Sequence, residues 1–242
     1  MEPAEYALMD AAEQGMWWYR ALHARLDDAL SLTSGRVLDA GCGTGGLLAV
    51  LKRRPGLDCV GLEYAALAAP RAAAKSGAPV VRGSINALPF ADASFDAAVS
   101  ADVLCHADVD PALALAELHR VLRGGGRLVV NMPAFMWLHS AHDRRVRNAR
   151  RTTAPALRAL LTQAGFVGVR AWYWNALLLP LMLVQRKLLA RGDAASDVAA
   201  FPPWQDSLLH TVTELERRLP HWMPAGGSVL ATARCPLSEP AP

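Results

Sequence analysis

The sequence has few charged residues and no long apolar run. The first deficit argues against a disordered chain, and the second argues against a membrane-spanning protein. Only 19% of the 242 residues are charged and 52% are hydrophobic, so the chain is expected to fold around a large core rather than to remain disordered. No stretch reaches the roughly 20 apolar residues that span a bilayer. The length fits one α/β domain or one core with an appended lid.

The four cysteines lack the C-x-x-C spacing of metal and redox sites. They are scattered along the chain as Cys42, Cys59, Cys105 and Cys235. This pattern argues against a metal cluster or a disulfide framework and fits a reducing cytosol. The acidic start, MEPAEYALMD, lacks the basic residues and apolar run of a signal peptide. We therefore predict a cytoplasmic protein without a metal. The net charge of +3 does not by itself favour nucleic acid.

Between Arg36 and Pro133, strand-like segments alternate with helix-like segments. The predicted strands span residues 36–41, 57–64, 78–84, 95–103 and 126–133. Asp110 precedes a proline and should cap the helix before the last of these strands, and Gly124–Gly126 should end that helix. Strands that alternate with helices predict a parallel sheet covered on both faces.

The regular alternation ends after Pro133. An arginine-rich connection at 133–152 precedes a helix that stops at Gly165, and the remaining strands are predicted at 167–175 and 227–236. The segment between those strands is too long for a hairpin, so we interpret it as an inserted helical lid. The chain is then one domain: a helical cap at 1–34, a core at 35–175 and 227–236, and the lid at 176–226.

The stretch RVLDAGCGTGGLL, residues 36–48, is a strand that ends in a glycine-rich loop and opens a helix. It satisfies G-x-G-x-x-G, a dinucleotide fingerprint, and also D-x-G-x-G-x-G. Unpaired N–H groups at such a helix start attract an anion. Asp39 would repel a pyrophosphate but could receive the ammonium group of S-adenosylmethionine. Glu63 ends the next strand, where a carboxylate accepts ribose hydroxyls in either ligand class.

Three more blocks follow in order: GSINALPF at 83–90, SFDAAVSADVLCH at 94–106 and ELHRVLRGGGRLVV at 117–130. Together with VLDAGCGTG they resemble the class I S-adenosylmethionine-dependent methyltransferases, and within them the bacterial small-molecule group of the methyltransferase type 11 kind. The resemblance implies an α/β, Rossmann-like sheet of seven strands, mostly parallel, in the order 3-2-1-4-5-7-6 with strand seven antiparallel. It implies S-adenosyl-L-methionine as cofactor and S-adenosyl-L-homocysteine as product.

Carried over by position, the resemblance implies that the methionine end, the ribose and the adenine each meet a separate group of residues. Relatives commonly have aspartate at the position of Ser84, so adenine is expected to depend more on apolar contact with Ile85 and Tyr64. Tyr19 and Arg20 are expected to close over the methionine carboxylate. The full cofactor set is Asp39, Gly41, Gly43, Glu63, Tyr64, Ser84, Ile85, Ala101, Tyr19 and Arg20.

The segment after the fifth strand should border the acceptor site, because ligands bind at the carboxyl ends of the strands in such sheets. If the acceptor is a hydroxyl, His142 is the first candidate for the general base and His106 the second. His142–Asp143 could also cap a helix, and His106 could be a structural histidine. The run of five arginines between 144 and 151 is either a solvated face or a site for an anionic acceptor, with Arg150 and Arg151 as its ligands.

The stretch WYWNALLLPLMLVQRKLLAR, residues 172–191, carries no charge until Arg186. We favour a lid helix packed on the sheet. The alternatives are an apolar channel for a lipid-like acceptor and shallow contact with a membrane surface. Trp172, Trp174 and Asn175 are expected at the base of the acceptor pocket.

These observations predict direct, in-line methyl transfer from S-adenosylmethionine to a small or lipid-like acceptor. A nucleic-acid methyltransferase would use the arginine run on phosphates. That alternative is disfavoured because the sequence lacks a separate RNA-binding module and the N/D-P-P-[YF] motif of many enzymes that methylate base amines. A non-catalytic module that only binds the cofactor stays open, because a glycine loop indicates binding and not turnover.

Overall fold

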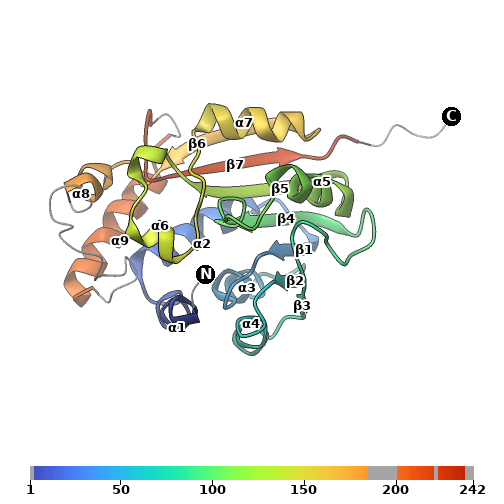
Figure 1. Cartoon of the computed structure of the whole chain (residues 1–242), viewed down its shortest axis with the longest axis horizontal. Coiled ribbons are helices and arrows are strands. Elements are labelled where there is room, and N and C mark those ends of the chain that lie inside the picture. Colours follow the sequence, from blue (N-terminus) through green and yellow to red (C-terminus); the bar gives the residue numbers. More distant parts are fainter. Residues whose placement is uncertain (1–2, 185–200, 221–222, 238–242) are drawn as a thin grey trace.

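The protein is built on a seven-stranded sheet, seen in a computed structural model that describes residues 3–184, 201–220 and 223–237 (Figure 1). The strand order is β3-β2-β1-β4-β5-β7-β6, with β7 antiparallel to both neighbours and every other pair parallel. Both features confirm the expected fold class. The strands are β1 (Gly35–Ala40), β2 (Leu57–Glu63), β3 (Val80–Arg82), β4 (Phe95–Ala101), β5 (Leu122–Pro133), β6 (Val167–Trp174) and β7 (Ser228–Arg234).

Helices cover both faces of this sheet and its carboxyl edge. They are α1 (Pro3–Ala12), α2 (Trp17–Ala29), α3 (Gly46–Leu51), α4 (Ala69–Ser76), α5 (Pro111–Val121), the 3-10 turn η1 (Met136–Leu138), α6 (Ala141–Arg145), α7 (Ala154–Gln163), α8 (Leu179–Leu183) and α9 (Pro203–Arg217). Within the described residues, no helix is both long enough and apolar enough to span a bilayer.

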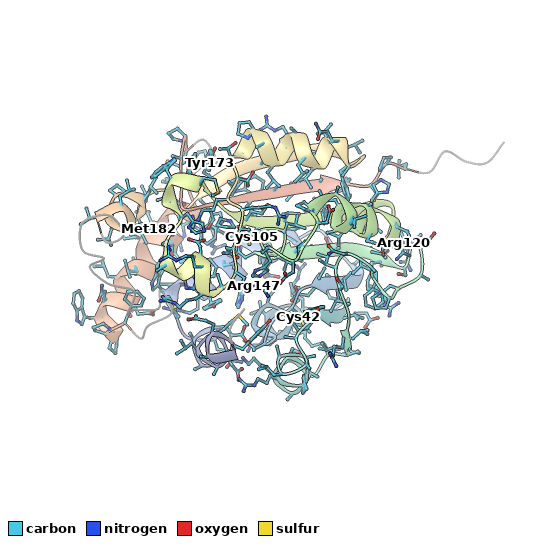
Figure 2. All side chains as sticks on the ribbon, in the orientation of Figure 1. Cys42, Cys105, Arg120, Arg147, Tyr173 and Met182 are labelled. Carbon is cyan, nitrogen blue, oxygen red and sulfur yellow. The ribbon has the colours of Figure 1, made fainter. Side chains whose placement is uncertain are left out.

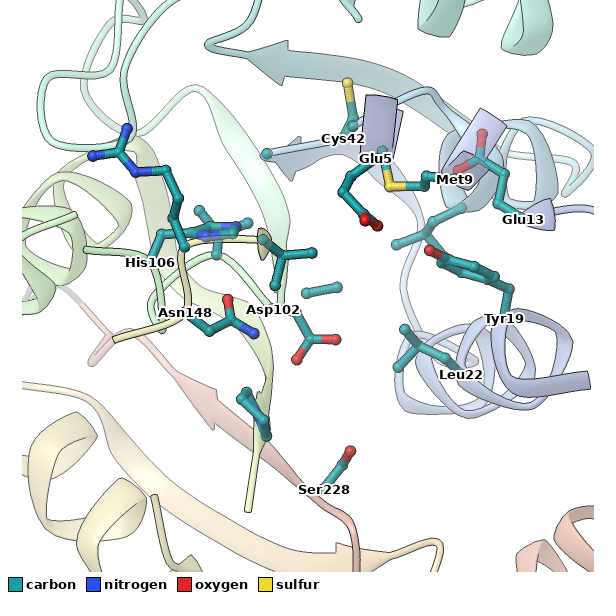
Figure 3. Close-up of a pocket in the computed structure, with 18 of the residues that line it drawn as sticks. Glu5, Met9, Glu13, Tyr19, Leu22, Cys42, Asp102, His106, Asn148 and Ser228 are labelled. Atoms are coloured by element: carbon teal, nitrogen blue, oxygen red, sulfur yellow. The ribbon is translucent and has the colours of Figure 1, made fainter. Parts of the chain in front are cut away.

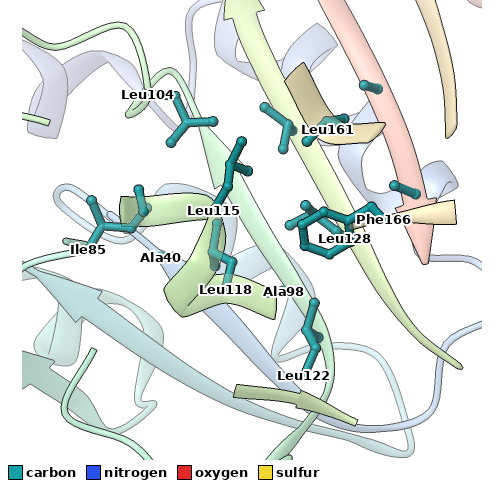
Figure 4. Close-up of a cluster of buried hydrophobic side chains, with 14 of the residues drawn as sticks. Ala40, Ile85, Ala98, Leu104, Leu115, Leu118, Leu122, Leu128, Leu161 and Phe166 are labelled. Carbon is teal, nitrogen blue, oxygen red and sulfur yellow. The ribbon is translucent and has the colours of Figure 1, made fainter. Parts of the chain in front are cut away.

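Successive residues of a central strand point to opposite faces, and each face has its own apolar layer. Leu38 packs with Leu115 and Leu118 of α5 and Leu161 of α7, in the cluster drawn in Figure 4. Val37, its neighbour in β1, packs on the other face with residues of α2, α3 and α4. Burial on both faces explains why the strands are almost continuously apolar.

The expected end of α5 was wrong. We predicted that Gly124–Gly126 end the helix, but it ends at Val121 and the glycines lie within β5. Leu122 is already extended, with φ −80° and ψ 140°, and it pairs with Phe95 of β4. Sheet pairing of a buried leucine therefore overrides the local preference of the glycines.

The helical cap consists of two helices, of which α1 lies against the glycine loop. Glu13 accepts a hydrogen bond from the Thr44 hydroxyl at 2.7 Å and forms an ion pair with Lys75 of α4. Glu5 pairs with Arg145 of α6 at 3.3 Å. These contacts tie α1 to both sides of the carboxyl edge, so it covers the edge at which ligands bind in such sheets.

The described part of the insertion between β6 and β7 is fixed to the core. The Glu216 carboxylate of α9 accepts the backbone N–H groups of Asn175, Ala176 and Leu177 at 2.6, 2.7 and 2.9 Å. Arg25 of α2 donates to the Thr213 carbonyl at 2.7 Å. The basic run after α8 (Arg186, Lys187 and Arg191), and with it the middle of the expected lid, lies outside the described residues.

Candidate active site

A cavity of about 600 Å³ opens at the carboxyl edge of the sheet and is lined by residues of α1 and α2 as well as by the strand ends (Figure 3). Its volume is that of a typical small-molecule or cofactor site. Most of the predicted site residues line it: Asp39, Gly41, Gly43, Glu63, Tyr64, Ser84, Ile85, Ala101, Tyr19, His106, His142, Arg151 and Asn175. Arg20 and Arg150 are not among its lining residues.

The loop after β1 needs glycines because neighbouring backbone and side chains approach it too closely to leave room for a Cβ atom. Gly41 has φ +100°, and a Cβ there would lie 2.3 Å from Val103. Gly45 has φ +93°, and its Cβ would lie 2.7 Å from the Cα of Ala72 in α4. Both conformations and both contacts require glycine. The loop is thereby held against β2, where the Gly41 N–H donates to the Leu62 carbonyl at 2.9 Å.

Asp39, near the end of β1, has a buried carboxylate oxygen without a hydrogen-bond donor among the described residues. Its side chain is 2% exposed, and its Oδ2 atom has no hydrogen-bond partner within the described chain. Burial, with the nearby charges of Glu13 and Glu63, raises the pKa of Asp39 to about 7. A buried carboxylate oxygen without a donor, close to two other acids, favours a cationic ligand group.

Glu63, the last residue of β2, is held in place by hydrogen bonds from the glycine loop, from its own strand end and from α1. Its Oε2 accepts the N–H of Gly43 at 2.9 Å, and its Oε1 accepts that of Ala65 at 2.8 Å. The Tyr6 hydroxyl of α1 also hydrogen-bonds to it. Burial raises the pKa of Glu63, and these N–H groups oppose the rise. A carboxylate has about four acceptor sites, and these donors use most of them, so the hydroxyl groups of a ligand would have to share or replace the contact with Tyr6.

The other predicted cofactor residues differ in how they face the cavity. Ser84 uses its hydroxyl to accept the N–H of Asn86 at 3.2 Å, and Ile85 is buried. Tyr64 is 74% exposed and belongs to the rim. Burial raises the pKa of Tyr19. Arg20 forms an ion pair with Asp206 of α9, so it joins the cap to the insertion and does not reach over the glycine loop.

Sequence reasoning missed Asp102, which follows β4 directly and points into the centre of the cavity (Figure 3). Its backbone N–H donates to the Asn131 carbonyl at 2.9 Å, and its Oδ1 accepts the Asn131 amide at 2.9 Å. Trp174 Nε1 donates to Asn131 Oδ1 at 2.8 Å, which fixes the amide. Burial raises the pKa of Asp102 to about 7. The sequence offered one signal that could have identified Asp102: it is an acidic residue directly after the end of a predicted strand.

The two predicted bases occupy different surroundings. His106 hydrogen-bonds to the backbone at Val146 and Arg147, and burial lowers its pKa. His142 lies in the short helix α6 and also lines the cavity. The neighbouring carboxylate, Asp143, is fully buried and accepts hydrogen bonds from Ser140, Asn148 and Arg151. Asp143 therefore organises the loop that carries His142.

The arginine run, too, is engaged with the protein itself. Arg151 meets both carboxylate oxygens of Asp143 at 2.9 Å, Arg147 meets Asp108 at 2.9 Å, and Arg145 pairs with Glu5. Arg150 donates to the carbonyl of His106. Carboxylates therefore neutralise Arg145, Arg147 and Arg151, whereas Arg150 keeps its charge and does not line the cavity.

The far end of the cavity is apolar and includes the insertion. Met182 of α8 (Figure 2) and Phe201 line it with Trp17 of α2. Asn175, the residue after β6, is 1% exposed and also lines this end. Its amide donates to the sulfur of Met182 at 3.4 Å, and its Oδ1 has no donor within the described chain. Across residues 3–184, 201–220 and 223–237, no three His, Cys, Asp or Glu side chains are grouped to hold a metal.

Residues 38–130 match a family model described as a methyltransferase domain. A demethylmenaquinone methyltransferase of Thermus thermophilus is 42% identical over 121 residues, which are 47% of this chain and 52% of that protein. A probable S-adenosylmethionine-dependent methyltransferase of Mycobacterium tuberculosis is 32% identical over 162 residues, 63% of this chain and 57% of that protein. The chain spans about half or less of the first curated relatives it matches, 49% of one and 32% of another.

Among solved structures, a possible histamine N-methyltransferase of Thermotoga maritima superposes with a TM-score of 0.63 at 21% identity, over 96% of this chain and 94% of that one. At this identity the likeness concerns the fold. Three observations point to the same fold: the matched family model, the strand order and the glycine loop with Asp39 and Glu63 beside it. Residues 38–130 are therefore similar to a methyltransferase domain, and the fold is the Rossmann-like fold of the class I S-adenosylmethionine-dependent methyltransferases.

Proposed function

We propose that the protein transfers the methyl group of S-adenosylmethionine to a small or lipid-like acceptor. The observation that carries the proposal is the unpartnered Oδ2 of Asp39, buried beside the glycine loop in a cavity that Glu63 also lines. An ammonium group satisfies this atom, whereas a pyrophosphate would be repelled by it. S-adenosylmethionine presents an ammonium group and a ribose, which are the two groups that this pair of carboxylates favours.

The residues present fit the cofactor along the whole edge from β1 to β3. Asp39 would receive the ammonium group and Glu63 the ribose hydroxyls, while Ser84 and Ile85 would lie beside the adenine. Arg20 is committed to Asp206, so we assign the methionine carboxylate no arginine partner. Met9 of α1 lies over Gly43, where a Cβ would come 2.9 Å from the Met9 methyl group, and closes the cavity above the loop.

The sulfonium of the cofactor makes its methyl group intrinsically reactive, so the chain must chiefly align the acceptor and exclude water. α1, tied down through Glu5 and Glu13, covers the cavity from one side. Met182 and Phe201 close the other side. Aligning two bound molecules in one covered cavity is worth several kcal/mol of the barrier in general, about 7–11 kcal/mol at best.

A small, largely apolar acceptor fits the remaining space. Its walls include Trp17, Leu22, Met182 and Phe201. Two relatives carry names of enzymes for lipid-like substrates, a demethylmenaquinone methyltransferase and a 24-methylenesterol C-methyltransferase. The insertion at 176–226 would serve as the lid of this half. Shallow membrane contact through its first helix remains part of the proposal because Leu177, Leu181 and Val184 are exposed.

Calorimetry with S-adenosylhomocysteine and with NAD⁺ tests the cofactor half of the proposal. S-adenosylhomocysteine should bind, and Asp39→Asn should weaken it by at least tenfold. Asp58→Asn, on the exposed side of β2, is the matched control and should bind as the wild type does. Binding of NAD⁺ in preference to S-adenosylhomocysteine would refute the cofactor assignment.

Label transfer tests the activity. The protein should move radioactive methyl groups from S-adenosylmethionine into a small-molecule fraction of cell extract. Tight cofactor binding without transfer into any fraction would identify a non-catalytic binding module instead. Transfer into RNA alone would favour the nucleic-acid alternative.

A further inference from the structure

Three residues shortly after strand ends have left-handed backbones, and two of them line the cavity. They are Asp102 after β4, Phe135 after β5 and Asn175 after β6, with φ of 55°, 52° and 59°. Such conformations are uncommon outside glycine, although Asp and Asn tolerate them best, and they concentrate at functional sites. Here they turn two oxygen-bearing side chains, those of Asp102 and Asn175, toward the same space.

Asp102 is held from two directions. Its backbone N–H and its Oδ1 atom both bond to Asn131, and Trp174 fixes the Asn131 amide from behind. Asn131 is fully buried and Trp174 is 2% exposed, so this chain of bonds cannot exchange freely with water. The arrangement fixes one carboxylate oxygen of Asp102 and leaves the other toward the cavity. A carboxylate positioned in this way is preorganised for a ligand.

The location of Asp102 separates it from the cofactor carboxylates. β4 lies between β1, which carries Asp39, and β5. Asp102 therefore stands at the boundary between the cofactor half and the half formed by the ends of β5, β6 and β7. The other acids of that half are neutralised: Asp143 pairs with Arg151 and Asp108 with Arg147.

Asn175 gives a second, independent indication of ligand chemistry. Its Oδ1 is a buried acceptor without a donor in the described chain. A buried acceptor of this kind is costly unless a ligand supplies a hydrogen. Asn175 thus requires a donor, Asp102 offers a carboxylate oxygen to one, and the apolar walls of the cavity fit an apolar body. An anionic acceptor fits none of these groups.

We propose, resting on the methyltransferase function above, that the acceptor is an amine with an apolar body, held as its ammonium ion by Asp102, and that Asp102 takes the proton that must leave the nitrogen. Asn175 lines the same cavity and offers a second acceptor to the bound molecule. Asp102 is then a catalytic residue and Asn131 a positioning residue. His106 and His142 shape the wall of the pocket.

The proton and electron balance is complete without a further reactant. Asp102 removes one proton from the ammonium group, which frees the nitrogen lone pair. The nitrogen lone pair forms a bond to the methyl carbon while the carbon–sulfur bond breaks. The electron pair of the carbon–sulfur bond stays on sulfur. The products are a neutral thioether, a methylated ammonium ion and a protonated Asp102, which returns its proton to water. The total charge is the same before and after the step.

Pairs of an amine and an alcohol of similar shape show whether the pocket recognises the charge of the acceptor or only its shape. With S-adenosylhomocysteine bound, the full chain is titrated with 2-phenylethylamine and 2-phenylethanol, tryptamine and tryptophol, and octylamine and 1-octanol. At least one amine should bind ten times more tightly than its alcohol. Asp102→Asn should reduce that preference to twofold or less. Asp108→Asn, a carboxylate of the same cavity that already has an arginine partner, should retain it.

The positioning role has its own readout, the pH profile of amine methylation. Asp102 faces Asn131, Arg151, Asp143 and Tyr19, and His106 and His142 lie in the same cavity. Trp174→Phe retains a smaller aromatic ring but removes the donor that fixes Asn131. It should move the acid limb of the profile to higher pH, because Asp102 loses part of the bond that favours its charged form. A purely structural role would lower the rate equally at every pH.

The outcomes separate this proposal from the one it rests on. Failure of S-adenosylhomocysteine to bind refutes the proposed function and the amine proposal together. Normal cofactor binding with equal affinity for every amine and its alcohol refutes the amine proposal alone. The same conclusion follows if the amine preference survives Asp102→Asn.

Discussion

The Arg151 guanidinium and the Asp143 carboxylate form a two-pronged ion pair with N–O distances of 2.9 Å, and both side chains are buried. The pair joins the loop after β5 to the short helix α6, and Arg151 also donates to the Ala134 carbonyl at 2.9 Å. It therefore fixes one wall of the acceptor half. Removing one partner of such a pair leaves the other as a buried, uncompensated charge.

Arg151→Ala should accordingly lower the free energy of unfolding by about 3–5 kcal/mol. Arg150→Ala, its neighbour, removes one hydrogen bond to a backbone carbonyl and should cost only about 1 kcal/mol. Urea unfolding followed by circular dichroism measures both. Equal stability of the two variants would show that the buried pair contributes little, and would return Arg151 to the predicted role of binding an anionic acceptor.

The glycines of the cofactor loop should differ in what they tolerate. Gly45→Ala combines a left-handed backbone with a Cβ 2.7 Å from the backbone of α4, which cannot move independently. Gly77→Ala has a similar backbone, with φ +66°, but open space around its Cβ. The control should lose about 1–2 kcal/mol of unfolding free energy, and Gly45→Ala should lose distinctly more. A melting experiment that ranks the two in the opposite order contradicts this explanation of the bare loop.

Asp39 should make ligand-free stability depend on pH. Its native pKa of about 7 lies above its ordinary value of 3.8, so between these values the native state binds more protons than the unfolded state. Its contribution to stability is full below about pH 4 and is lost as the pH rises through about 7. Asp39→Asn should therefore be more stable than the wild type above pH 7. The check is the difference in unfolding free energy between the two proteins across that window, which a wild type more stable than the variant at pH 8 would contradict.

Cofactor binding should release protons from the same carboxylate. Near pH 7 a large fraction of Asp39 is protonated without ligand, and an arriving ammonium group favours the ionised form. Calorimetry of S-adenosylhomocysteine binding in buffers of different ionisation enthalpy counts the released protons. The release should be absent in Asp39→Asn. Wild-type binding with no exchange of protons near pH 7 would argue that the ammonium group lies elsewhere.

Glu216 should be essential to the acceptor half but not to the cofactor half. Glu216→Ala removes the acceptor of three backbone N–H groups at the end of β6 and should lower the free energy of unfolding by about 2–4 kcal/mol. Glu214→Ala, two residues away in a more exposed pair with Arg217, should cost about 1 kcal/mol or less. In the Glu216 variant, methyl transfer should fall while the affinity for S-adenosylhomocysteine survives. Loss of cofactor affinity with intact transfer would reverse the assignment of the two halves.

Local sequence patterns were enough to predict the sheet and the strand ends that form the proposed cofactor site. Three features can be recognised from short stretches of sequence: the continuous apolar strands, the caps of the helices and the glycine loop. They suffice to predict a parallel sheet, because hydrogen bonding and burial within each βα unit leave few other arrangements. Asp39 and Glu63 could be chosen for the same reason: each lies at or near the end of a strand, and parallel strands bring such ends to one edge. The end of α5 could not be predicted, because the pairing of Leu122 with Phe95 joins residues far apart in the chain.

The sequence by itself determined the fold class, the glycine loop and the identity of the carboxylates at its edge, since these depend on residue type and short spacing. Only the tertiary structure decided which charges remain available to a ligand. Arg20 and Arg151 each have a suitable type and place for binding an anion, but Asp206 and Asp143 neutralise them. Asp102 has a cavity-facing oxygen because Asn131 and Trp174, from two other strands, hold its side chain in place. The pairing of Arg20 with Asp206 joins segments far apart in the chain, so it follows from packing and no local pattern encodes it.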